Sequence, residues 1–208
     1  MTLVQTPAVD APVDDASIPL AFLVASRICH DLVGPLGAIA NGLELMAMTG
    51  DSTPESELVA DSVAAATARV RLFRLAYGVS SPGQVTSHGE VRTILKAIAA
   101  SGRLSYEWTP TGECPRAEVR CALLLLQCLE TAMPQGGRIR IDRDAAAWTL
   151  AAEGAGLRLD EAVWQPLRGG PAPETASLVH FALLPALLHG LGRTLSLDLG
   201  AGRIVAQF

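Results

Sequence analysis

The chain has 208 residues, of which 50% are hydrophobic and 18% are charged, and its formal net charge is −5. This length can bury one large or two small cores. The acidic balance argues against a nucleic-acid-binding protein, which needs clustered positive charge to neutralise phosphates. No apolar run approaches the roughly 18 to 20 residues that span a bilayer, so we expect a cytoplasmic protein that does not enter a membrane. Residues 1–18 have neither a basic start nor an apolar block, which predicts a flexible arm rather than a signal peptide.

Two long helical patterns follow the arm. Apolar residues recur at steps of three and four over residues 20–48 and again over residues 55–77, which predicts two helices. Pro35 removes one backbone donor and should kink the first helix. The segment 49–54 has the composition of a turn, so the two helices should form an antiparallel hairpin.

A single hairpin of this kind cannot cover both apolar stripes from water. No second helical pair of this length follows, so the simplest closed arrangement is a symmetric dimer in which two hairpins form a four-helix bundle. We therefore expect residues 19–79 to be a dimerisation domain. The apolar stripe of its second helix, which would lie in the seam of the bundle, comprises Val59, Val63, Ala66, Val70, Phe73 and Tyr77.

The periodicity changes after a Ser-Ser-Pro-Gly linker at residues 80–83. Residues 84–208 should form a second domain with short strands and helices. Adjacent strands without a crossover helix predict a mostly antiparallel or mixed sheet with helices on one face, so the fold class is α+β: a helical hairpin followed by an α/β sandwich. The predicted elements are helices at 90–101, 116–132, 160–165 and 176–189, and strands at 104–108, 138–142, 148–152, 194–199 and 203–208.

His30 is the first candidate for chemistry. At 100° per residue it points about 200° away from Ile28, so it leaves the apolar stripe and faces solvent. An exposed imidazole on a clear helix face suits a nucleophile that meets a phosphoryl group held by another protein. The alternative is an ordinary surface histidine beside glycines that mark helix–helix contact. The residues on its face are Ser26, Arg27, Val33, Gly34, Gly37 and Asn41.

The run from His30 to Glu44, HDLVGPLGAIANGLE, resembles the H-box of two-component histidine kinases: a phospho-accepting histidine, then an acidic residue and, five residues on, a proline. It is similar in particular to the ChpT-type histidine phosphotransferases of alphaproteobacteria, from about Leu20 onward. The resemblance implies a dimeric four-helix bundle followed by a domain shaped like a kinase ATPase that has lost ATP. It also implies a histidine phosphotransferase that moves a phosphoryl group on His30 from the receiver domain of a hybrid histidine kinase to the aspartate of response regulators.

The second domain departs from the kinase pattern where the resemblance places the nucleotide contacts. Cys128 replaces the magnesium-binding Asn, and a thiol is a poor ligand for a hard cation. Ala152 replaces the adenine-reading Asp ahead of Gly154 and Gly156, and the segment 169–175 is not a glycine-rich phosphate lid. The resemblance therefore implies that the chain binds no ATP, metal or other cofactor, and that the receiver supplies Mg²⁺.

Two further features surround the histidine. Asp31 either orients or deprotonates the imidazole, or only sets its tautomer or forms a surface pair. Arg71 and Arg74 should lie level with His30 on the second helix, with Arg27 one turn above it. These cations either stabilise the phosphoryl group and meet the acidic pocket of a receiver, or form a solvated face paired with carboxylates.

Two other functions stay open from the sequence. One is an ATP-dependent histidine kinase with an unusual nucleotide site, and the other is a non-catalytic dimeric adaptor that binds receivers without accepting phosphate. If His30 is not the acceptor, the remaining candidates are His88, His180 and His189.

Overall fold

The computed structural model describes residues 28, 32, 34–39, 41–46, 48, 54–78, 80–100, 102–145, 147–173, 175–200 and 202–208. The predicted N-terminal arm lies outside these residues, and so do residues 49–53 of the predicted turn at 49–54, whereas Pro54 begins a helix. Ahead of α2, the described residues from 28 to 48 are helical.

The described helices agree closely with the predicted ones. The α-helices are α2 (Pro54–Ala76), α3 (His88–Ala100), α4 (Arg116–Thr131), α5 (Glu161–Trp164) and α6 (Val179–Gly190), with 3-10 turns at Gln165–Arg168 and Ala176–Leu178. None of the helices within the described ranges is long and apolar enough to cross a bilayer.

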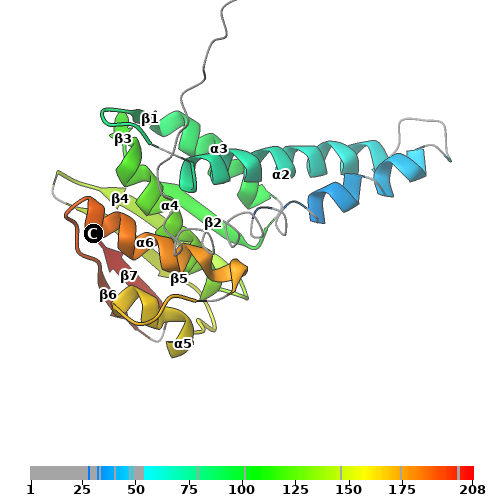
Figure 1. Ribbon diagram of the computed structural model, residues 1–208. Coiled ribbons are helices and arrows are strands. Elements are labelled where there is room, and N and C mark those ends of the chain that lie inside the picture. Colours follow the sequence, from blue (N-terminus) through cyan, green and yellow to red (C-terminus); the bar gives the residue numbers. More distant parts are fainter. Residues whose placement is uncertain are drawn as a thin grey trace, which may run out of the picture.

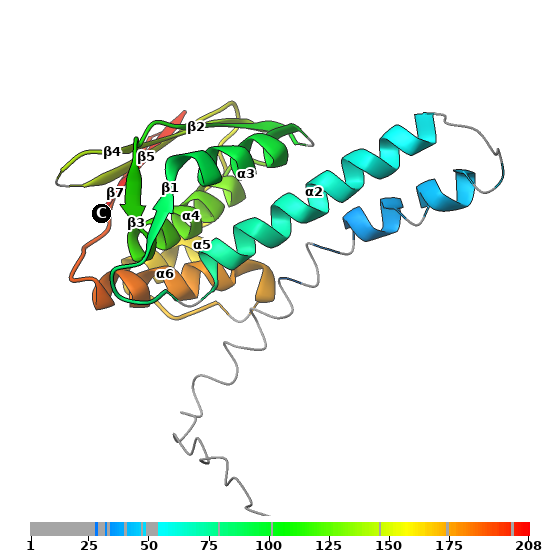
Figure 2. The same cartoon turned by 90° about the horizontal axis from the view of Figure 1, so that it is seen from above.

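The strands form one large sheet and one small ribbon. The elements are β1 (Val85–Ser87), β2 (Leu104–Trp108), β3 (Glu113–Pro115), β4 (Gly137–Arg143), β5 (Trp148–Glu153), β6 (Ser196–Leu199) and β7 (Arg203–Gln207). The large sheet has the order β2-β4-β5-β7-β6; β2 and β4 are parallel, and the other neighbours are antiparallel. Helices α3, α4 and α6 cover one face of it (Figure 2). The predicted α+β class and mixed sheet are confirmed, whereas the β1–β3 ribbon was not predicted, because three-residue strands show no clear alternation.

Helix α4 is the centre of the core. Its residues 123–126 are four consecutive leucines, and all of them are fully buried. An amphipathic surface helix would expose at least one of four consecutive positions, so α4 is apolar on every side. It packs on the sheet and contacts α2 and α6 as well.

The C-terminal part of α2 belongs to the same core as the sheet domain. Leu72 and Leu75 are buried in one cluster with the residues of α3 and α4. The hydroxyl of Tyr77 donates to Gln127 of α4 at 2.8 Å. Residues on both sides of the predicted linker at 80–83 therefore share one core, and the N-terminal part of α2 extends beyond it (Figure 1).

Two arginines of α4 hold the end of α2. The guanidinium of Arg116 donates to the carbonyl of Arg74 at 2.9 Å, and that of Arg120 donates to the carbonyl of Ala76 at 3.2 Å. The last carbonyls of a helix have no partner within the helix, so cationic donors stabilise them. These contacts fix the direction of α2 relative to the sheet.

The predicted seam of α2 needs a correction. Val63 and Val70 are 46% and 49% exposed in the single chain, as a seam residue should be before a partner binds. Phe73 is only 3% exposed, and its ring lies 5.6 Å from that of Tyr77, which is bonded to α4. The assignment of Phe73 and Tyr77 to a dimer seam is therefore wrong, because the chain already buries or binds both side chains itself.

Glu118 at the start of α4 joins three elements of the fold. Its carboxylate accepts hydrogen bonds from Trp148 Nε1 at 2.8 Å, from Arg143 Nε at 3.1 Å and from Arg193 Nη2 at 3.3 Å. Burial alone would raise the pKa of Glu118, but the hydrogen bond from Trp148 and the two guanidinium groups outweigh burial and lower that pKa. The ionised carboxylate is the form that stabilises the fold.

We expect Glu118→Gln to lower the free energy of unfolding near neutral pH by about 1–3 kcal/mol, because it removes charge-assisted hydrogen bonds. Since the pKa of Glu118 is lower in the folded chain than its usual 4.5, this stabilisation is complete above that value and is lost as the pH falls through the folded pKa. Urea denaturation at a series of pH values should show the difference between the two proteins shrinking in the acid range. Glu161→Gln, which affects only an exposed pair with Arg168, is the control and should change stability by less than about 0.5 kcal/mol. A difference for Glu118→Gln that does not vary with pH would contradict this role.

Candidate phosphotransfer site

The described residues on the predicted helix face of His30 are exposed. His30 and Asp31 lie outside the described residues, as do Ser26, Arg27 and Val33. Gly34, Gly37 and Asn41 are all exposed. A Cβ built on either glycine would have no neighbour within 4 Å in the part of the chain that the structure describes. Neither glycine is therefore needed for close packing against the described residues.

Arg71 and Arg74 lie on the exposed side of α2, facing the start of α3. Arg74 is 70% exposed, and its Nη2 lies 3.6 Å from Glu90 Oε1. Arg71 lines two hollows between α2 and α3, with volumes of about 450 and 240 Å³, and Thr93 of α3 lines both. Arg74 lines the larger hollow as well and has a carboxylate partner there, Glu90. That the two arginines flank His30 stays a prediction.

The two positions that the resemblance places at kinase nucleotide contacts are apolar and enclosed. Cys128 and Ala152 are both fully buried. Burial raises the pKa of the Cys128 thiol well above its usual value, so the thiol stays neutral. Ala152 pairs with Ile139 of β4 on one side and with Ile204 of β7 on the other. Neither position presents a charged or ligating group to a nucleotide.

The two glycines that follow β5 have packing roles. A Cβ on Gly154 would lie 2.7 Å from the carbonyl oxygen of Gly136, and one on Gly156 would lie 3.1 Å from the side chain of Gln135. Gly156 also has a φ of 67°, which favours glycine. The backbone N–H of Arg158 donates to Ala132 at 2.9 Å. The loop is thus held tightly on the end of α4, which accounts for its glycines without a nucleotide.

No group of three or more His, Cys, Asp or Glu side chains that could hold a metal ion lies within the described ranges. In the segment 169–175, where the kinase pattern has its phosphate lid, Gly169 has a φ of 87° and ends the 3-10 turn Gln165–Arg168. Its N–H and that of Gly170 bond back to carbonyls of this turn. The start of this segment is therefore a helix cap.

Sequence reasoning missed the α3 side of the hollows beside α2. Gly89, Glu90 and Thr93 line the larger hollow together with Arg71. The sequence predicts a helix from residue 90, which includes Glu90 and Thr93, but it does not say what this helix faces. Only the packing of α3 on α2 brings them next to the arginines.

Comparisons with known proteins identify the class of the chain. A family model described as the histidine phosphotransferase C-terminal domain matches residues 88–203. The chain is 28% identical over 169 residues to protein phosphotransferase ChpT of Brucella abortus (strain 2308), which covers 78% of this chain and 80% of that protein. A solved structure described as a bacterial phosphotransferase matches with a TM-score of 0.77 and 27% identity, over 94% of this chain and 98% of that one. The chain therefore belongs to the histidine phosphotransferase family.

Within this family, the resemblance to ChpT-type proteins that the H-box predicted is confirmed. The chain is a phosphotransferase that acts in a phosphorelay, and this function implies kinase and response-regulator partners in general. The two alternative functions, an ATP-dependent kinase and a non-catalytic adaptor, are not favoured by these comparisons.

Restoring the kinase-type residue at position 152 should damage the fold. Ala152→Asp places a carboxylate between two isoleucines in a closed core, and burying an unpaired charge costs several kcal/mol. Ala155→Asp makes the same chemical change three residues away at an exposed position, so we expect it to alter stability by less than about 0.5 kcal/mol. Urea denaturation measures both variants. Equal stability of the two would show that position 152 is not enclosed.

Proposed function

We propose that His30 carries the phosphoryl group, which it receives from the receiver domain of a hybrid histidine kinase and passes to the aspartate of response regulators, in the cytoplasm. The observation that carries the proposal is the H-box run that begins at His30, in a chain of the histidine phosphotransferase family. The exposed small residues Gly34 and Gly37, four and seven positions further along, support it because a folded receiver needs such clearance.

The transfer needs few groups from this chain. An imidazole nitrogen of His30 attacks the phosphorus of an aspartyl phosphate, the P–N bond forms, and the carboxylate of the receiver leaves. The second half-reaction reverses these steps on another receiver. Positioning and neutralisation of charge provide most of the acceleration in phosphoryl transfer, and Mg²⁺ bound by the receiver supplies part of that neutralisation.

Asp31 and the nearby cations have supporting roles in this proposal. Asp31 orients the ring of His30 or moves its proton, and Arg71 and Arg74, with Arg27, attract the acidic pocket of the receiver. The exposure of Arg71 beside a hollow of about 450 Å³ supports a contact with a partner. The remaining residues of this partner surface are Ser26, Val33, Gly34, Gly37 and Asn41.

ATP is not the phosphoryl donor in this proposal. The buried apolar positions Cys128 and Ala152 support this, because a nucleotide and its metal need polar contacts there. Each lost polar contact is worth about 1–3 kcal/mol, so two losses weaken binding by about one to four orders of magnitude.

We expect His30→Ala to abolish labelling by a phosphorylated receiver domain and to leave the fold intact. Labelled ATP without another protein should label neither form, and receiver-derived label should be acid-labile and base-stable, as a phosphohistidine is. His189→Ala, which removes an exposed histidine of α6, is the matched control and should accept phosphate normally. A folded His30→Ala protein that still accepts phosphate would refute the assignment, and label taken directly from ATP would make the chain a kinase.

We also propose that the chain acts as a homodimer through a four-helix bundle. Large apolar side chains are exposed on both N-terminal helical segments, whereas a soluble chain normally covers such a set. A second copy would bury them, and the dimer would present one phosphotransfer site on each side. The exposed residues are Leu36, Leu43, Leu45 and Met48 in the first segment and Leu58, Val63 and Val70 in α2.

Val63→Glu should yield a folded monomer, because the carboxylate would be buried in the seam of the dimer but is exposed in a single chain. Val85→Glu is the matched control: Val85 has the same exposed fraction, 46%, but lies on β1. It should remain a dimer. Light scattering reports the mass, and circular dichroism reports the fold. A stable monomer of the unmodified protein would refute the bundle.

A further inference from the structure

Strand β2 forms an edge of the large sheet, and its outer side has no partner strand in the part of the chain that the structure describes. The N–H of Gly137 donates to Arg103, and the N–H of Thr109 donates to Ile141, which sets the register of β2 on β4. Backbone groups of successive residues alternate between the two sides of a strand. The N–H and C=O groups that point to the open edge are therefore those of Leu104, Tyr106 and Trp108.

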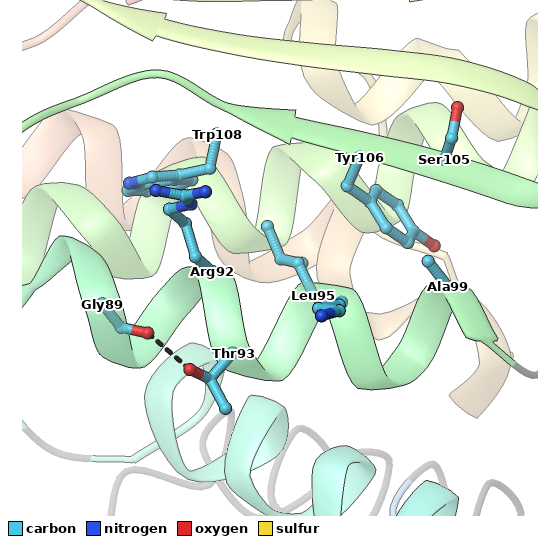
Figure 3. Close-up of a pocket in the computed structure, with 9 residues that line it drawn as sticks. Gly89, Arg92, Thr93, Leu95, Ala99, Ser105, Tyr106 and Trp108 are labelled. Atoms are coloured by element: carbon cyan, nitrogen blue, oxygen red, sulfur yellow. Dashed lines mark hydrogen bonds between the residues drawn. The ribbon is translucent and has the colours of Figure 1, made fainter.

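A groove of about 520 Å³ lies between β2 and α3, beside this edge. Figure 3 shows Tyr106 and Trp108 reaching from β2 toward α3, where Leu95 lies below them. The hydroxyl of Tyr106 donates to Glu130 of α4 at 2.5 Å, which holds this side of the groove in place. The side of the groove formed by α3 has small residues at both ends, Gly89 and Ala99, so the backbone of a bound segment can approach α3 closely there.

The middle of the α3 wall is cationic. Arg92 and Lys96 line the groove and are exposed, and neither forms an ion pair with another described residue. They are four residues apart in a helix, a rise of about 6 Å. Side chains two residues apart in an extended strand are about 6.6 Å apart. Two acidic side chains at alternate positions of a strand therefore match the spacing of the two cations.

The same charges disfavour pairing of two copies of this chain through β2. Each copy would bring Arg92 and Lys96 to the shared edge, and exposed edges are commonly protected from self-association by such cations. An extended segment of a different, acidic protein meets no such repulsion. Main-chain hydrogen bonds to an edge strand provide affinity in this kind of recognition, and the flanking side chains provide specificity.

We propose that the groove between α3 and β2 binds an extended acidic segment of a partner protein, which adds to the sheet as a strand beside β2. Acidic side chains at alternate positions of this segment pair with Arg92 and Lys96. The proposal is independent of the phosphotransfer chemistry, because it involves neither His30 nor the residues assigned to its partner surface.

The test uses the full chain and a fluorescein-labelled peptide, Ser-Thr-Glu-Val-Glu-Val-Thr-Ser, in a fluorescence polarisation titration. We expect the same peptide with Gln in place of both Glu residues to bind at least about tenfold more weakly, because charge-assisted hydrogen bonds are lost. Arg92→Gln/Lys96→Gln should weaken the Glu peptide to a similar degree. Arg158→Glu, an exposed site on the loop after β5, changes the net charge by the same amount and should not affect binding.

Hydrogen exchange of single amides distinguishes strand addition from simple charge attraction. With saturating peptide, the amides of Leu104, Tyr106 and Trp108 should exchange at least about tenfold more slowly, since they become bonded. Arg92→Glu/Lys96→Glu should bind the peptide with Lys in place of both Glu residues. Equal binding of the Glu and Gln peptides, or unchanged exchange at the three edge amides, would overturn the proposal. So would slow exchange that depends on protein concentration without peptide, because a second copy would then occupy the edge.

Discussion

The structure depends on the burial of α4. The leucines at 123–126 are enclosed by the sheet on one side and by other helices on the other (Figure 2). A helix that is apolar on every side is stable only inside a core, so the remaining elements are arranged around it. Helix α4 also sets the direction of α2, because its Arg116 and Arg120 donate hydrogen bonds to the last carbonyls of α2.

The same burial includes the two positions that the resemblance places at kinase nucleotide contacts. Cys128 lies within α4, and Ala152 lies on β5, which packs against α4. Both side chains are part of the core, and the glycines after β5 let its loop close onto the end of α4. Polar groups at these positions would weaken the packing that holds the domain together. The domain thus provides a rigid base for α2, and its edge strand β2 has no second partner strand among the described residues.

Much of this architecture was predictable from local pattern. The strand at Leu104–Trp108 was predicted with its observed bounds, and α2 was predicted to within one residue at each end. The spacing of apolar residues indicates whether a segment is a helix or a strand and which side of it is buried, so long periodic segments are well predicted. The short strands β1 and β3 could not be predicted, because three residues carry too little periodicity. The H-box depends only on the order of residues, so the sequence alone indicated phosphotransfer.

By itself, then, the sequence determined the elements from residue 54 onward and the α+β class, and it singled out His30 as the candidate phosphoacceptor. Only the tertiary structure decided which side chains of one apolar stripe remain exposed to solvent. Val63 and Phe73 belong to the same apolar stripe of α2, but Val63 is 46% exposed and Phe73 is 3% exposed. It also decided that Arg92 and Lys96 stand beside a sheet edge, because β2 is the last strand in the order and has no second partner strand among the described residues. The physical reason is the same in both cases. The spacing of residues along one helix or strand shows which side of it is apolar. What covers that side depends on contacts between residues far apart in the chain.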